Sequence, residues 1–319
     1  MNKVCLDSFY INIKTPLFYP NLNTPAKTLR PGIKYMLLST FSFAFMNLFI
    51  KKISTIPPME VVFFRCAVSM LLCLLVIYRQ KLNWKGSHRG LLLARGIFGT
   101  ISLYAFFLTL QNMPLGTAVT IQYLSPVFTT IIAIFLLGEA VKPLQWLFFA
   151  ISFSGVLVIK GFDNRISITM LLIGIGSAIA SGFAYNMVRS LKQKEPAMVI
   201  VLHFQFVGIV VGLLFSIFNW KMPQGMDWVY LGLTGISTQA GQVYLTKALQ
   251  TEKIADATIM NYLGIIYALI LGFLFFSEQY GIIALAGIAL VIGGVALNFI
   301  YQKLNNRVVV EEELTTIEE

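Results

Sequence analysis

Ten long apolar runs cover most of this chain, and none of the connections between them is long enough to hold a soluble domain. A helix needs roughly 20 predominantly apolar residues to cross the hydrocarbon core of a bilayer. Runs such as 131–137 and 284–291 lack the polar face that a helix on a soluble protein would show. The pattern predicts ten transmembrane helices, over 33–50, 60–78, 90–110, 115–137, 143–160, 168–190, 197–218, 227–247, 254–276 and 281–301.

The chain also repeats itself, because residues 38–159 align without a gap with residues 177–298. Identical residues recur along this alignment, among them Asn47 and Asn186, Pro57 and Pro196, Tyr123 and Tyr262, and Glu139 and Glu278. Each unit holds five predicted helices, and an odd number makes the second unit enter the bilayer from the opposite side. We therefore expect an all-α integral membrane protein with ten transmembrane helices in two inverted five-helix repeats, 33–160 and 168–301.

Composition agrees with a membrane protein, since 57% of the residues are hydrophobic and the mean hydropathy is +0.77. Residues 1–32 lack the apolar core of a signal peptide, so we expect a cytoplasmic arm there. Residues 302–319 end in clustered glutamates and predict an acidic cytoplasmic tail. The three cysteines predict no disulfide framework, because Cys66 and Cys73 lie two helical turns apart.

A net charge of +10 would suit a nucleic-acid-binding protein, but the distribution of the basic residues points elsewhere. With the N-terminus in the cytoplasm, seventeen of the 24 Lys and Arg residues fall on the cytoplasmic side and five on the outer side. That bias follows the positive-inside rule. We expect both termini in the cytoplasm, the lipid bilayer of the cell (inner) membrane as the partner, and no nucleic acid.

Several motifs point to a family: Phe63-Phe64-Arg65, Arg95–Gly99, Leu110–Ala118, Tyr123–Pro126 and Gly138-Glu139. With these motifs the chain, over about 33–301, resembles the EamA-type branch of the drug/metabolite transporter superfamily. The resemblance implies alternating access to a central cavity surrounded by helices 1–4 and 6–9, with helices 5 and 10 outside it. Gly264 and Ile265 replace Ser125 and Pro126 in the second half, so a proline-associated break is expected in helix 4 and not assumed in helix 9.

Three basic or titratable side chains fall within predicted spans: Arg65, Arg95 and His203. An intramembrane charge is costly and usually faces a wet cavity or a partner. For Arg65 the alternatives are snorkelling to the outer headgroups or pairing with Glu60, and for Arg95 snorkelling to the cytoplasmic side. His203 is either a proton-responsive gate or a neutral side chain hydrogen-bonded inside the bundle.

Uncharged polar residues on helices 1, 3, 4, 6, 8 and 9 complete the predicted binding site. A cavity for organic molecules combines aromatic bodies with a few oriented polar groups. The alternative for each is a hydrogen bond between helices. The candidates are Asn47, Tyr104, Gln122, Tyr123, Asn186, Gln239, Gln242, Tyr244, Asn261 and Tyr262. Glu139 and Glu278 end helices 4 and 9, and we interpret them as caps of the next helix or as partners of a loop lysine.

The sequence offers no enzyme site and no cofactor site. It lacks Cys/His metal spacing, a phosphate-binding glycine loop and a nucleophile matched to a base, so we expect no catalytic residue, metal or cofactor. The favoured function is transport of a small organic metabolite, anionic or zwitterionic and amino-acid-like. Alternatives are a carrier of neutral or aromatic metabolites or drugs, and a non-transporting membrane scaffold. A homodimer remains open, as does coupling: a facilitator or exchanger, against proton coupling through His203.

Overall fold

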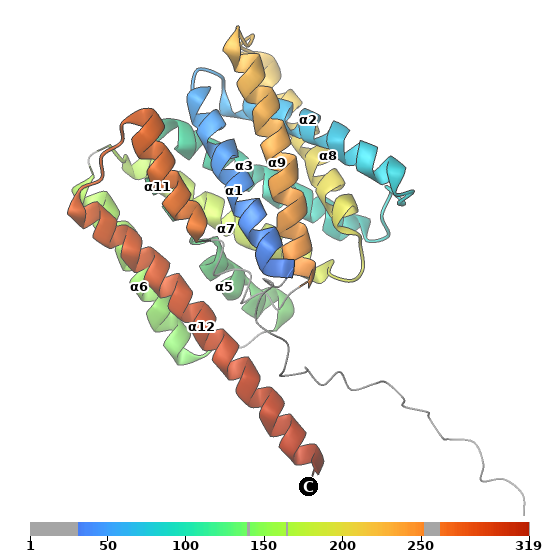
Figure 1. Ribbon diagram of the computed structural model, residues 1–319, viewed down its shortest axis with the longest axis vertical. Helices are drawn as coiled ribbons and strands as arrows, with labels where there is room; N and C mark the ends of the chain where they lie inside the picture. The colour runs from blue at the N-terminus through green and yellow to red at the C-terminus, as the bar shows by residue number, and fades with distance from the viewer. Residues whose placement is uncertain (1–30, 139–140, 164, 252–261, 319) are drawn as a thin grey trace, which may run out of the picture.

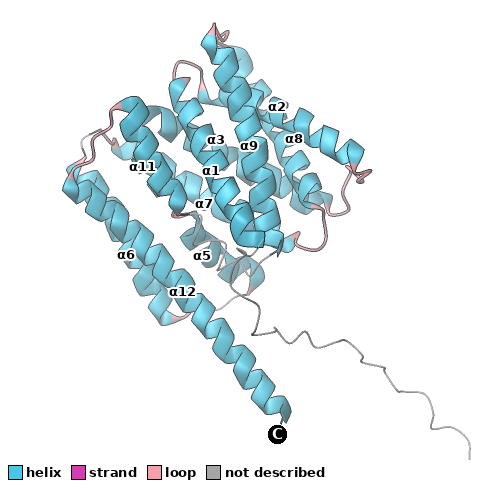
Figure 2. Cartoon of the chain, viewed as in Figure 1, coloured by secondary structure: helices cyan, strands magenta, loops and turns pink. Residues whose placement is uncertain are grey.

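Every regular element in the described part of this computed structural model is helical (Figures 1 and 2). The structure describes residues 31–138, 141–163, 165–251 and 262–318. The first half contains α1 (Pro31–Lys52), α2 (Pro58–Arg79), α3 (Arg89–Asn112), α4 (Leu115–Gln122), α5 (Ser125–Leu137) and α6 (Pro143–Phe162). The second contains α7 (Ile168–Ser190), α8 (Ala197–Ser216), the 3₁₀ turn η1 (Ile217–Asn219), α9 (Met226–Thr251), α11 (Leu263–Phe276) and α12 (Ile282–Glu318).

Eight segments of the described chain are long and apolar enough to cross a membrane, and α4 with α5 counts as one of them. Two predicted spans fall outside this group: α9, which has 26 residues, and α11, which has only 14. Large apolar side chains such as Phe135, Phe218 and Ile282 lie almost fully exposed, as expected for a surface that faces lipid. The helix α12 continues through the acidic segment 302–318 rather than ending at the predicted span.

The predicted break in helix 4 is present, and its cause is local. The helix α4 ends at Gln122 and α5 begins at Ser125, with Pro126 in the first turn of α5. Pro126 has no N–H to donate, so the backbone tightens at this point and the N–H of Leu124 donates to the carbonyl of Ile121 at 3.0 Å. The structure begins describing helix 9 only at Tyr262, so the predicted asymmetry between helices 4 and 9 lies partly outside the described residues.

Helices of the two halves pack against each other in matched pairs. The most extensive contacts join α1 to α9, α3 to α7, α2 to α8 and α6 to α12. The pair α6 and α12 lies to one side of the other helices (Figure 1). This pair packs closely because Gly155 and Gly287 face each other: a Cβ on Gly155 would lie 2.5 Å from the carbonyl oxygen of Gly287.

A carboxylate of the second half caps a helix of the first half. The loop between α7 and α8 carries Glu195, whose Oε1 accepts hydrogen bonds from the backbone N–H groups of Ser87 and His88, at the start of α3. The His88 ring nitrogen Nδ1 lies 3.3 Å from the same oxygen. Burial alone would raise the pKa of Glu195, but these bonds outweigh it and hold the pKa below the ordinary value of 4.5.

This cap predicts a pH-dependent stability. Because the folded-state pKa of Glu195 is depressed, its contribution is complete above pH 4.5 and is lost as the pH falls through the lower folded-state pKa. We expect Glu195→Ala to lower the free energy of unfolding by about 1 kcal/mol at neutral pH. Thermal unfolding in detergent should show the difference from wild type shrinking on acidification.

The control for this prediction is Lys194→Ala, which changes an exposed residue of the same loop. A Glu195→Ala deficit that stays constant from neutral to strongly acidic pH would contradict the role of the ionised carboxylate.

Candidate functional site

A cavity of about 130 Å³ lies between the two halves. Its lining comes from α1, α2, α3, α4, α5, α7, α8 and α9, and none of its lining residues belongs to α6 or α12. Six of the thirteen residues predicted to bind substrate line it: Asn47, Arg65, Arg95, Gln122, Tyr123 and Gln242. The volume is below the roughly 300–1,000 Å³ of pockets for drug-sized ligands, so this conformation suits a small molecule.

Arg65 lies on α2 and is fully buried, with no ion-pair partner among the described residues. Its Nη2 donates to the Gln205 side-chain oxygen at 3.4 Å, while Nε and Nη1 have no hydrogen-bond partner. The guanidinium carbon lies 5.4 Å from the centre of the Phe204 ring. Glu60 does not pair with it, since Glu60 accepts a hydrogen bond from the backbone of Lys221. Snorkelling and pairing with Glu60 are therefore both wrong.

A series of hydrogen bonds between two buried amides and a hydroxyl positions the group that binds Arg65. Gln205 on α8 donates from Nε2 to the hydroxyl of Ser69 at 2.9 Å, and Ser69 donates to the side-chain oxygen of Gln239 at 2.6 Å. Donation by the Gln205 amide fixes which way it points, so its oxygen faces Arg65. Gln239, predicted to bind substrate, does not line the cavity and instead accepts the last of these hydrogen bonds.

Arg95 on α3 also turns into the cavity rather than towards the membrane surface, so snorkelling is not seen. The side chain is only 6% exposed, and its guanidinium carbon lies 4.2 Å from the centre of the Phe204 ring. The Nε has no hydrogen-bond partner. Space for this conformation comes from Gly99, one turn further along α3, where a Cβ would lie 2.0 Å from Nη1 of Arg95.

Gln122 lines the cavity but its amide is committed to the wall. Its Nε2 donates to the Ser181 hydroxyl at 2.7 Å, and its oxygen accepts from Ser177 at the same distance. Ser102 lies 2.6 Å from Ser181, which closes a network between α3, α4 and α7. Asn47 differs, because its buried side-chain oxygen has no hydrogen-bond donor.

Tyr123, at the break in helix 4, packs against its repeat counterpart. The rings of Tyr123 and Tyr262 lie 5.5 Å apart between centres. The phenol oxygen of Tyr123 occupies the space in front of Gly264, where a Cβ would lie only 2.1 Å away. Gly264 replaces the serine found at the matching position of the first half, Ser125, and this contact gives the physical reason.

The other predicted residues lie elsewhere. Asn186 donates to the carbonyls of Thr129 and Gly182 and so ties α7 to α5, and Tyr244 stacks on Tyr35. His203 lies with Nδ1 2.9 Å from the carbonyl oxygen of Val199, one turn earlier in α8. None of these, nor Tyr104 or Tyr262, lines the cavity, and Asn261 lies outside the described residues.

Several lining residues were not predicted, notably Phe204, Tyr185, Leu103 and Phe106. The repeat could have identified them, because four pairs of repeat counterparts both line the cavity. These pairs are Met46 with Tyr185, Arg65 with Phe204, Leu103 with Gln242, and Phe106 with Leu245. The cavity thus straddles the two halves at equivalent positions, with a cation on one side of it and an aromatic ring at the matching position.

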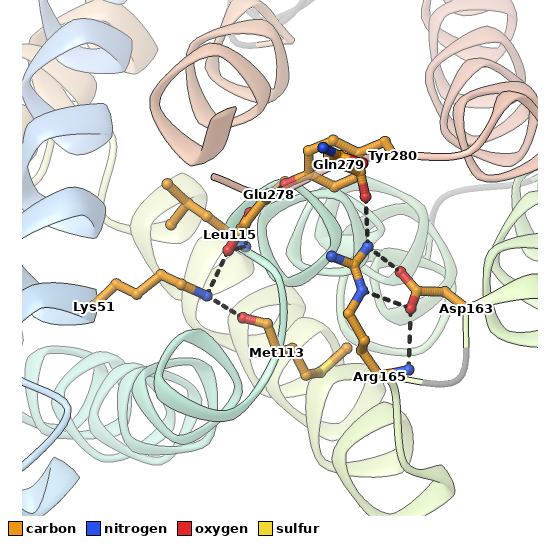
Figure 3. A network of polar contacts seen from close by, with 9 residues as sticks. Lys51, Met113, Leu115, Asp163, Arg165, Glu278, Gln279 and Tyr280 are labelled. Atoms are coloured by element: carbon orange, nitrogen blue, oxygen red, sulfur yellow. Dashed lines mark hydrogen bonds and ion pairs between the residues drawn. The ribbon is translucent and has the colours of Figure 1, made fainter. Parts of the chain in front are cut away.

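At the end of the bundle where α1 finishes, a second carboxylate of the second half caps the first half (Figure 3). Glu278 accepts from the backbone N–H of Leu115, the first residue of α4, at 2.8 Å and forms an ion pair with Lys51 at 2.8 Å. Tyr280 donates to Glu278 and accepts from the N–H of Gly116 at 2.9 Å. We call these residues, Lys51, Leu115, Gly116, Glu278 and Tyr280, the Glu278 junction.

The surroundings of the Glu278 junction keep the Tyr280 hydroxyl protonated and strengthen the ion pair. Burial and the neighbouring Glu278 carboxylate raise the pKa of Tyr280, so its hydroxyl remains a donor. The Lys51 and Glu278 side chains are only 13% and 8% exposed, which strengthens their ion pair relative to one in water. Glu278 is a helix cap and a lysine partner, but the helix that it caps is α4 of the other half rather than the next helix, and Lys51 lies in the last turn of α1 rather than in a loop. Glu139 lies outside the described residues.

Comparison with known proteins identifies one family twice along the chain. The EamA-like transporter family matches residues 30–161 and again residues 168–300. The pseudopaline exporter CntI of Pseudomonas aeruginosa is 27% identical over 274 residues, which cover 85% of this chain and 96% of that protein. Human solute carrier family 35 member G1 is 29% identical over 265 residues, 77% of this chain and 73% of that protein.

A solved crystal structure shares the fold. It superposes with a TM-score of 0.62 at 16% sequence identity, and the match covers 85% of this chain and 96% of the other.

The close contact between the Tyr123 phenol and Gly264 yields a prediction. We expect Gly264→Ser to displace the Tyr123 phenol and to lower the free energy of unfolding by about 1–3 kcal/mol, because the added atoms have no space. Thermal unfolding in detergent measures this loss.

The control for this prediction is Gly176→Ser, where an added Cβ meets nothing within 4 Å. Adding Tyr123→Ala to Gly264→Ser should recover part of the loss. Equal unfolding of the Gly264→Ser and Gly176→Ser variants would show that the contact does not constrain Tyr123.

Proposed function

The chain belongs to the EamA-like transporter family, and we propose that it moves a small organic metabolite with an anionic group across the cell membrane by alternating access. The observation that carries the proposal is the pair of buried, unneutralised arginines, Arg65 and Arg95, on the cavity wall. The family and its relatives are transporters rather than enzymes. The family membership therefore supports a membrane transporter, and the anionic substrate is our inference.

Guanidinium groups select anions for a simple reason: they carry charge and donate hydrogen bonds but accept none. A charge that has left water without a partner raises the free energy of the protein by several kcal/mol, by rough estimate. A carboxylate brings both a compensating charge and acceptors for Nε and Nη1 of Arg65, which have none in the described structure. The unpaired N–H groups of Arg65 and its unneutralised charge thus favour the same ligand, a carboxylate.

Asn47 adds a second feature to the proposed substrate. Its buried side-chain oxygen accepts no hydrogen bond although Asn47 lines the cavity. An acceptor without a donor suits an ammonium or hydroxyl group of the ligand. A zwitterionic, amino-acid-like molecule would place its negatively charged end at the arginines and its ammonium at Asn47. A neutral aromatic substrate, held mainly by tyrosines, has less support, because Tyr104, Tyr244 and Tyr262, three of the four candidate tyrosines, do not line the cavity.

We further propose that two inverted five-helix halves, ten helices in all, rock about the cavity. The matched packing of α1 on α9 and of α3 on α7 supports this, as do the four pairs of repeat counterparts around the cavity. With both termini in the cytoplasm, as the basic residues indicate, the Glu278 junction lies on the outer side. The junction then closes the outer end, while Glu195 joins the halves at the inner end.

The hypothesis of an anionic substrate predicts what happens when one of the two arginine charges is removed. We expect Arg65→Gln to reduce uptake of anionic metabolites into proteoliposomes by roughly tenfold or more, because a charged hydrogen-bonding group at the ligand is lost. Anionic, cationic and neutral metabolites compete in the same assay. Folding should persist, since the substitution removes an uncompensated buried charge.

The matched control for this prediction is Arg79→Gln, which makes the same change at the exposed end of the same helix. Transport restricted to organic cations, or an Arg65→Gln protein that competes for anions as the wild type does, would contradict the anionic substrate.

The closed outer end yields a second prediction. Lys51→Met removes the ion pair of Glu278, so we expect the outer end to open more often. A cysteine at Val119, which lines the cavity, should then react with a membrane-impermeant thiol reagent from outside roughly tenfold faster. The assay uses a protein whose three native cysteines are replaced.

Lys52→Met is the control, because Lys52 is the neighbouring lysine and forms no ion pair with Glu278. Equal labelling rates in the Lys51→Met and Lys52→Met proteins would mean that the junction does not hold the outer end closed.

For energy coupling we propose a facilitator or exchanger driven by the substrate gradient. His203 contacts a carbonyl of its own helix and does not line the cavity, which suits a structural histidine. We expect His203→Ala and wild type to exchange substrate equally, with or without a pH gradient across proteoliposomes. Uphill accumulation driven by the pH gradient in wild type, and abolished in His203→Ala, would establish proton coupling instead.

A further inference from the structure

Two guanidinium groups share one aromatic ring in the cavity. Arg65 comes from α2 and Arg95 from α3, and their guanidinium carbons lie 5.4 Å and 4.2 Å from the centre of the Phe204 ring. The two carbons therefore cannot be further apart than the sum of these two distances. The negative face of the ring attracts both cations, but a quadrupole offsets a full charge only in part.

Neither cation has a counter-ion in the described structure. The neutral oxygen of Gln205, at 3.4 Å, is the hydrogen-bond acceptor that Arg65 has there. Nε and Nη1 of Arg65 and Nε of Arg95 have no hydrogen-bond partner although all three atoms are buried. The two guanidiniums also repel each other, because they carry charges of the same sign. The low dielectric constant of the buried site strengthens this repulsion.

The rest of the cavity wall cannot compensate these charges. Among the described residues, the lining contains no Asp or Glu, and its other polar groups are amides, hydroxyls and phenols. The amide of Gln122 and the hydroxyls of Ser102, Ser177 and Ser181 already bond to one another. Turning any of them towards an arginine would break a bond that the buried network needs.

From this geometry we propose that the transported molecule carries two negative charges, one for each guanidinium, as two carboxylates or as one doubly charged group. This inference rests on the proposed anionic substrate and counts its charges. A molecule with one charge leaves one buried guanidinium uncompensated, whereas one with two charges neutralises both. Phe204 then acts as the spacer that sets where the two cations meet the ligand.

The test measures binding rather than transport and varies charge at nearly constant size. Purified protein is titrated with malonate, succinate and glutarate and with the monoamide of each, at pH 7, where the free carboxylates are ionised. The readout is the ligand concentration that gives half of the maximal thermal stabilisation. We expect at least one dicarboxylate to bind roughly tenfold or more tightly than its own monoamide.

Single-arginine variants then locate the two charges. In Arg65→Gln and in Arg95→Gln we expect the preference for the dicarboxylate over its monoamide to fall to about threefold or less, because one cation remains. The surface variant Arg79→Gln should keep the full preference. Arg95→Lys, which keeps the charge, should retain more of the preference than Arg95→Gln.

Three results would overturn the inference: equal binding of the dicarboxylates and their monoamides, no binding by either, or a preference that survives in both single variants. Equal binding together with anion transport that depends on Arg65 would show that one carboxylate bridges both guanidiniums, and the proposed function would stand. Transport restricted to cations would instead remove the proposed function itself.

Discussion

The cost of keeping two guanidinium groups inside a membrane protein without a counter-ion governs this site. Arg65 is fully buried and Arg95 nearly so. The described residues offer Arg65 the neutral oxygen of Gln205, and aromatic rings lie against both guanidiniums, Phe204 against both and Phe107 against Arg65. The helices α2 and α3 must hold these side chains in place against solvation by the headgroups. Gln205 of α8, whose orientation Ser69 fixes, binds Arg65, and Gly99 of α3 leaves room for Arg95. The protein thus maintains a positive cavity that a ligand completes.

The repeat explains where this cavity lies and why it is not symmetric. Counterpart positions of the two halves face each other across it, so duplication of one unit creates a cavity between the copies. Divergence then replaces symmetric chemistry by complementary chemistry, as where Arg65 faces the ring at its counterpart position, Phe204. Similar divergence places Gly264 opposite Tyr123, where a second serine would leave no space. The repeat thus determines where the cavity lies, and the residues that differ between the two halves determine what it can bind.

Much of this could be predicted from the sequence, because hydrophobic runs and their connections determine membrane helices directly. The break before Pro126, the exclusion of α6 and α12 from the cavity and the inward position of both arginines agree with the predictions. The amides were harder: Gln239 and Asn186 bond to other helices, while Asn47 and Gln242 line the cavity. Residue type alone does not separate these roles, since a buried amide needs partners in either case. Phe204 was missed because a single phenylalanine in an apolar helix carries no signal of its own.

The most direct measurement of the central claim is to look for an anion in the cavity. Crystals grown in bromide in place of chloride would give an anomalous signal at each bound halide. If Arg65 and Arg95 form an uncompensated pair, wild type should hold bromide beside the Phe204 ring, and the signal should weaken in Arg65→Gln. A cavity free of bromide in wild type, with halides bound at surface lysines of the same crystal, would show that the two charges are neutralised in another way.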